Sequence, residues 1–135
     1  MKSFNILILE DDLKTLSVIM DVLAQLEEDL RYNFLVTVYS TYKDVEEIVN
    51  KVNLQKFDMI LLDRDCKLGG SFHVLNIEKI DPNKIVSISA IYKYNEEALA
   101  RGVRRVITKD HDNLKIFALQ LSEQVRLFLF KYVKK

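Results

Sequence analysis

Met59-Ile60-Leu61-Leu62-Asp63 is a run of four apolar residues that ends in a carboxylate. A run this short, without alternating polar residues, predicts a strand buried on both faces, as in parallel sheets. Four more runs of this kind occur along the chain, at 6–9, 34–39, 85–91 and 103–108. The chain therefore predicts five buried parallel strands, with the third at 59–62.

The segments between and after these runs have helical spacing. In most of them apolar residues recur every three or four positions, and 72–79 is short and poorly periodic. The expected helices lie at 16–26 behind a cap at Asp12, 45–52 behind Thr41, 72–79, 95–101 between a cap at Asn95 and a stop at Gly102, and 114–132. Strand and helix thus alternate five times. Because such connections cross right-handed, they predict an α/β fold, a doubly wound five-stranded parallel sheet with helices on both faces.

Length and composition exclude several classes of function. A chain of 135 residues forms one domain, which excludes an enzyme with separate cofactor and substrate lobes. Twenty basic residues cancel twenty acidic ones, so no global field attracts nucleic acid or a membrane surface. A single cysteine and the lack of a signal or membrane segment favour the cytoplasm.

Acidic residues follow two of the predicted strands. Glu10-Asp11-Asp12 follows the first, and Asp63-Arg64-Asp65 follows the third. Each cluster alone is explained equally well by helix capping. If the two strands are neighbours, however, the crowded carboxylates need a cation, and their oxygens suit Mg²⁺.

A hydroxyl and an ammonium follow the last two predicted strands. Ser89-Ala90 ends the fourth, and Thr108-Lys109 ends the fifth. A phosphoryl group on a carboxylate oxygen needs a cation, a hydroxyl donor and a lysine as partners. All of these elements lie at carboxyl ends of strands, where doubly wound sheets bind ligands.

At these residues the chain resembles the receiver domain of bacterial two-component response regulators, over nearly its whole length. The resemblance is carried by Ile6-Leu7-Ile8-Leu9-Glu10-Asp11-Asp12, Phe57-Asp58-Met59-Ile60-Leu61-Leu62-Asp63, Ile85-Val86-Ser87-Ile88-Ser89-Ala90, and the approach to Thr108-Lys109. It implies the flavodoxin-like (βα)5 fold with strand order 2-1-3-4-5.

The resemblance also implies roles for individual residues. Glu10, Asp11 and Asp63 would bind Mg²⁺, and Asp63 would accept phosphate from a histidine kinase or a histidine phosphotransfer protein. Ser89 would bond the phosphoryl group and Lys109 would pair with it. The chain would then be a signalling module of a phosphorelay that acts by protein contact, and not an enzyme.

Two other functions remain open. Lys109 is followed by Asp110, where the family usually has proline, and Val106 stands where many receivers carry an aromatic switch residue. These departures favour a receiver-like scaffold that is not phosphorylated. The second alternative is a haloacid-dehalogenase-like phosphatase with Asp63 as nucleophile and Asp65 as general acid/base. In that family, however, the metal-binding acidic pair follows the lysine, whereas here the acidic pair precedes Asp63.

Two further expectations concern signalling. With Val106 in the switch position, Tyr92 or Tyr94 becomes the candidate switch residue. A continuous helix over 113–135 would be about 35 Å long and would partly overhang the sheet. Because Leu127, Phe130 and Val133 lie off its buried stripe, we expect self-association or docking of a downstream protein target through this helix.

Overall fold

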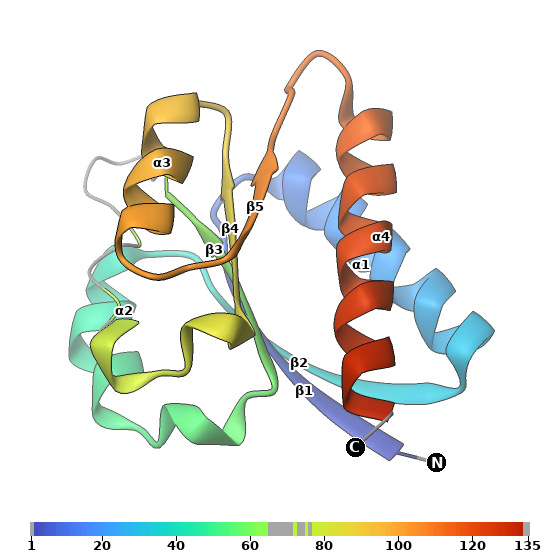
Figure 1. Cartoon of the computed structure of the whole chain (residues 1–135), viewed down its shortest axis with the longest axis horizontal. Coiled ribbons are helices and arrows are strands. Elements are labelled where there is room, and N and C mark those ends of the chain that lie inside the picture. Colours follow the sequence, from blue (N-terminus) through green and yellow to red (C-terminus); the bar gives the residue numbers. More distant parts are fainter. Residues whose placement is uncertain (1, 65–71, 73–74, 76, 134–135) are drawn as a thin grey trace.

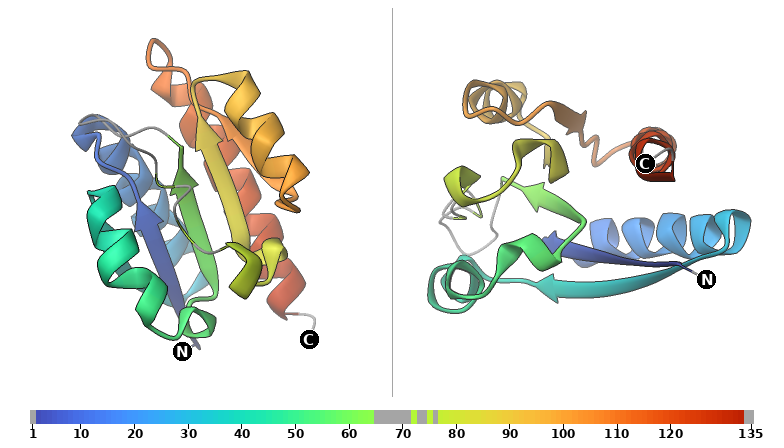
Figure 2. Two further views of the ribbon diagram at one scale, coloured as in Figure 1. Left: turned by 90° about the vertical axis from the view of Figure 1, so that its left-hand side faces the viewer. Right: turned by 60° about the horizontal axis from the view of Figure 1, so that its bottom comes forward.

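Five parallel strands form one sheet in the computed structural model, which describes residues 2–64, 72, 75 and 77–133. The strands are β1 (Lys2–Leu9), β2 (Tyr32–Tyr39), β3 (Met59–Asp63), β4 (Ile85–Ser89) and β5 (Arg105–Thr108). Their order is β2-β1-β3-β4-β5, and all four pairings are parallel (Figure 1). The left view of Figure 2 shows β1, β3 and β4 pointing the same way. The predicted architecture and strand order are confirmed.

Helices cover both faces of the sheet. Helices α1 (Leu13–Leu30) and α4 (Leu114–Val133) lie on one face, and α2 (Tyr42–Glu47) and α3 (Tyr92–Ala100) lie on the other (Figure 1). Alternate strand residues supply the two cores: Ile8, Leu61 and Ile107 belong to the α1/α4 core. Leu9, Leu62 and Ile85 belong to the α2/α3 core. Because side chains alternate between the two faces of a strand, this pattern decides toward which face each residue at a strand end points.

Two of the expected caps begin helices as predicted. The Asp12 side chain accepts the N–H of Thr15 at 3.0 Å, and Thr41 accepts the N–H of Asp44 at 3.2 Å. Gly102, with φ of +101°, follows α3 as the predicted stop. Helix α2 does not reach residue 52 as predicted. It ends at Glu47 and is followed by a 3-10 turn, η1 (Val49–Lys51).

The strands differ from the prediction in burial and length. Edge strand β2 was expected to be buried on both faces, yet Leu35 and Val36 are exposed. Edge strand β5 is also only partly buried, and it begins at Arg105 because Val103 instead bonds to the end of α3. An edge strand has only one neighbour, so its apolar residues are less covered.

The region 72–79, expected to be helical, forms a 3-10 turn, η4 (Ile77–Lys79), with Phe72 and Leu75 buried before it. Its other residues lie outside the described ranges. Two more 3-10 turns, η2 (Leu54–Lys56) and η5 (Pro82–Lys84), precede β3 and β4. In the part of the chain that the structure describes, no helix is both long and apolar enough for a membrane span.

Helix α3 begins three residues earlier than predicted. Its first residue is Tyr92, so β4 ends at Ser89 and Asn95 is an interior residue, not a cap. The buried Asn95 side chain accepts the hydroxyl of Ser87 at 3.2 Å and donates to the carbonyl of Ile107 at 3.1 Å. A single amide thus ties α3 to β4 and β5.

We expect Asn95→Ala to lower the free energy of unfolding by about 2–3 kcal/mol, because the change removes two buried hydrogen bonds and leaves a small cavity. Urea denaturation would measure it. The matched control is Asn83→Ala at an exposed position, where a change within about 0.5 kcal/mol is expected. Equal losses in the two variants would contradict the bridging role of Asn95.

Helix α4 is packed along most of its length. Strands β1 and β2 begin at Lys2 and Tyr32, earlier than predicted, so the sheet reaches further under the helix. The Phe4 ring meets the Phe128 ring edge-on at 5.8 Å, and Leu129 is buried. The helix is therefore covered as far as Leu129, and an overhang of its last residues stays a prediction. Leu127 and Phe130 are exposed as predicted, whereas the Val133 side chain lies outside the described part.

Candidate functional site

Glu10, Asp63 and Lys109 meet at the carboxyl edge of the sheet. Each lies two residues beyond a member of the α1/α4 core, namely Ile8, Leu61 and Ile107, so the strand alternation turns all three toward the same face. Only 1% of Glu10, 2% of Asp63 and 3% of Lys109 is exposed. Charged groups are seldom this buried unless they are paired.

The lysine joins the two carboxylates. Lys109 Nζ lies 2.6 Å from Asp63 Oδ2 and 3.2 Å from Glu10 Oε1. Its backbone is held by the N–H of Lys109, which donates to the carbonyl of Ser89 at 2.8 Å. Peptide bonds throughout the described ranges are trans. Lys109 therefore reaches Asp63 although Asp110 replaces the usual proline.

One ammonium cannot balance two buried carboxylates. The shorter contact is to Asp63, and burial raises the pKa of the Glu10 carboxyl to about 10, with Asp63 adding to the effect through a hydrogen bond and charge repulsion. Glu10 Oε2 is buried and meets no donor among the described residues. The raised pKa favours the protonated form of Glu10, which can donate a hydrogen bond toward Asp63.

The lysine stays charged in this setting. Burial alone would lower the pKa of the Lys109 ammonium, but attraction to Asp63 and Glu10 and their hydrogen bonds outweigh burial and raise it. The site therefore keeps a fixed positive charge against Asp63 across the physiological range.

Ser89 ends β4, between the strands that carry Asp63 and Lys109. Its side chain is fully buried, and its hydroxyl oxygen accepts the N–H of Ile91 at 3.0 Å. The sheet register pairs Asp63 with Ile88 and Ser89 with Thr108. The predicted hydroxyl residue thus lies at the same sheet edge as the carboxylates and the lysine.

The remaining acidic residues have different positions. Asp12 caps α1, as the capping interpretation of that cluster allowed, and Asp11 is partly exposed. Asp65, the general acid/base of the phosphatase alternative, lies outside the described residues, as do Cys66 and His73.

The cluster has some of the features of a Mg²⁺ site. Carboxylate oxygens are the ligands this cation prefers, and the unpartnered Glu10 Oε2 is a buried oxygen of that kind. Within the described ranges, however, no three His, Cys, Asp or Glu side chains are grouped closely enough to hold a metal ion. The carboxylate oxygens therefore suit Mg²⁺ chemically, but the Lys109 ammonium lies between Glu10 and Asp63 in the arrangement observed.

Arg64 is the residue at this edge that sequence reasoning missed. Its guanidinium carbon lies 4.3 Å from the centre of the Tyr94 ring, and its Nη2 lies 3.8 Å from a Glu97 oxygen. Of the two candidate switch tyrosines, Tyr94 contacts Arg64, the described residue directly after Asp63, and the Tyr92 side chain is exposed. The only sequence signal for Arg64 was its place directly after Asp63.

Comparison with known proteins bears on the fold alone. Neither a known protein family nor a curated protein sequence matches the chain. A response regulator receiver domain from Rhodospirillum rubrum is similar in structure, with 17% identity and a TM-score of 0.61. The similarity covers 96% of this chain and 94% of that one.

A second similar structure is a fusion protein that carries the trimeric coiled coil of yeast Spc42. Identity is 20%, the TM-score is 0.56, and 93% of this chain and 82% of that one are covered. A coiled coil alone cannot match a five-stranded α/β chain over that length. Together with the strand order, the similarity to the Rhodospirillum rubrum domain shows that the chain has the fold of a response regulator receiver domain.

Proposed function

We propose that this chain is a phosphorylation-controlled receiver module that accepts a phosphoryl group on Asp63 from a histidine kinase or a histidine phosphotransfer protein. The observation that carries the proposal is the buried Asp63–Lys109 contact of 2.6 Å at the carboxyl edge of a receiver-type sheet. Burying such a cluster is costly for stability, so its presence is better explained by chemistry than by folding.

In the proposed reaction, an Asp63 carboxylate oxygen attacks the phosphorus of a phosphohistidine. A P–O bond forms, the P–N bond breaks, and the histidine nitrogen leaves with the electron pair and takes up a proton from solvent. Lys109 orients the attacking carboxylate and then pairs with the acyl phosphate. The Ser89 hydroxyl is the proposed hydrogen-bond donor to a phosphoryl oxygen.

Glu10, Asp11 and Asp63 are the proposed Mg²⁺ ligands. When bound, Mg²⁺ would neutralise the charge on the phosphoryl oxygens. The role of this chain's residues is to provide oxygen donors at one sheet edge and to keep bulk water away through the burial of Glu10 and Asp63.

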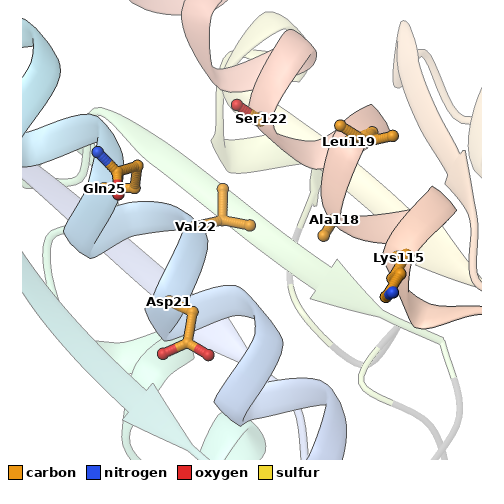
Figure 3. A pocket seen from close by; sticks show the side chains of 7 residues that line it. All are labelled: Asp21, Val22, Gln25, Lys115, Ala118, Leu119 and Ser122. Atoms are coloured by element: carbon orange, nitrogen blue, oxygen red, sulfur yellow. The ribbon is translucent and has the colours of Figure 1, made fainter.

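The proposed output is contact with a downstream protein or a second copy through α4. Ile116, Leu119, Leu127 and Phe130 expose apolar side chains on this helix. Leu119 also borders a groove of about 450 Å³ between α1 and α4, where Figure 3 shows it near Ala118 and opposite Val22. An apolar surface of this kind supports a protein contact.

We expect treatment with acetyl phosphate and Mg²⁺ to add a single phosphate to the chain, and EDTA to abolish the addition. Intact-mass spectrometry measures the adduct, and its lability to hydroxylamine identifies an acyl phosphate. Absence of an adduct at any Mg²⁺ concentration, together with no adduct from a phosphohistidine donor, would contradict the proposal and favour the unphosphorylated scaffold.

A further inference from the structure

Arg64 links the end of β3 to helix α3. The residue directly follows Asp63, and its backbone N–H donates to the carbonyl of Ile88 at 3.1 Å, which fixes its main chain. Its side chain leaves the sheet edge toward α3, where the guanidinium lies over the Tyr94 ring. One turn further along the helix, Glu97 lies 3.8 Å from Nη2.

Among the described residues, the guanidinium is held by weak contacts. The Glu97 side chain is 45% exposed and its distance from Arg64 is near the limit for an ion pair, so solvent screens the attraction. Arg64 Nε is buried and has no hydrogen-bond partner within the described part of the chain. A doubly negative group nearby would attract the Arg64 guanidinium more strongly than Tyr94 or Glu97 does, and it would accept a hydrogen bond from Nε.

The first turn of helix α3 is anchored to β4 and β5 by Asn95, but the residues before Asn95 have no side-chain cap. Its first cap position is Ile91, whose side chain cannot cap, and the N–H of Ile91 is bonded to the Ser89 hydroxyl. Ile91 and Tyr92 are exposed beside this turn, so any change in its position alters an apolar surface. The Arg64 contacts with Tyr94 and Glu97 are therefore well placed to control this end of α3.

We propose that Arg64 is the positioning residue that transmits the charge state of Asp63 to α3, an inference that rests on the proposed function. Phosphorylation of Asp63 draws the guanidinium from Tyr94 and Glu97 to the phosphoryl oxygens. The first turn of α3 then loses its contact with the end of β3 while Asn95 still holds it to β4 and β5, and the surface that includes Ile91 and Tyr92 changes. The environment of the Tyr94 ring thereby depends on the phosphorylation of Asp63 through Arg64, although position 106 holds no aromatic residue.

The experiment uses the full chain with ¹³C-labelled tyrosine rings, assigned by Tyr→Phe substitutions, and beryllofluoride with Mg²⁺ as the phosphoryl mimic. The ¹⁹F spectrum reports binding of the mimic separately from the ring signals. In the wild type we expect bound fluoride and a shift of the Tyr94 ring signals. In Arg64→Gln we expect bound fluoride but no shift at Tyr94 on binding.

Two controls separate this role from general effects. Arg101→Gln removes a different arginine, at the C-cap of α3, which pairs with Glu78 at 3.2 Å, and should retain the Tyr94 shift. Arg64→Lys restores the charge without the planar group and should recover part of the shift.

The outcomes are distinct for the two proposals. Bound fluoride without a Tyr94 shift in the wild type, or a full shift in Arg64→Gln, would overturn the role of Arg64 and leave the proposed function standing. Absence of bound fluoride in the wild type would instead count against the proposed function, and the Arg64 inference would be lost with it.

Discussion

Replacing Asp63 by asparagine is expected to reduce phosphate incorporation from a small-molecule donor to background. The amide oxygen is a poor nucleophile and carries no charge to attract Mg²⁺ or Lys109, so both the attack and its positioning are lost. Since asparagine has nearly the same shape and can still accept a hydrogen bond from Lys109, the fold should persist. Intact-mass spectrometry after donor treatment would quantify the adduct.

The matched control for this change is Asp21→Asn, an exposed carboxylate on α1. It should incorporate phosphate at the wild-type level, and circular dichroism should show that both variants are folded. An undiminished adduct in Asp63→Asn would place the acceptor elsewhere and remove the assignment of Asp63. A loss in both variants would point to a general effect of charge, and not to a specific acceptor.

The sheet was predictable because its signal is local. Each strand is marked by a short, mainly apolar run, although Ser87 and Arg104-Arg105 interrupt two of them, and strand order follows from the family resemblance. Burial of β2 was overestimated because Leu35 and Val36 are apolar, although the expected strand order already placed their strand at the edge. The early starts of β1 and β2 were missed because Lys2 and Asn33 break the apolar pattern, although parallel pairing continues through them.

The residues that form the site could be predicted from the sequence, but the contacts that connect the site to helix α3 could not. Glu10, Asp63, Ser89 and Lys109 could each be placed at a strand end from the sequence. The two partners of Arg64 lie 30 and 33 residues further along the chain, on a helix whose start was misplaced. Asn95 was taken for a cap because asparagine commonly caps helices, whereas its two partners become apparent only when β4, β5 and α3 pack together.

Glu10→Gln is expected to stabilise the metal-free protein increasingly as pH rises. Below pH 4.5 both the folded and the unfolded chain hold the proton on Glu10. Above it the unfolded carboxyl ionises, while the folded one keeps its proton until about pH 10, so rising pH favours unfolding of the wild type. Glutamine has no such proton, and the difference in unfolding free energy should grow by up to about 1.4 kcal/mol per pH unit across this window.

Urea denaturation in EDTA at about pH 5, 7 and 9 would measure the effect, with exposed Glu28→Gln as the control expected to give a constant difference. Glutamine can donate its amide N–H toward Asp63 as the protonated Glu10 does, so packing and hydrogen bonding are retained while ionisation is removed. A pH-independent difference for Glu10→Gln would contradict the protonated state of Glu10. A rising difference would show that this carboxyl lowers stability at neutral pH, as expected for a group whose ionised form serves to bind a cation.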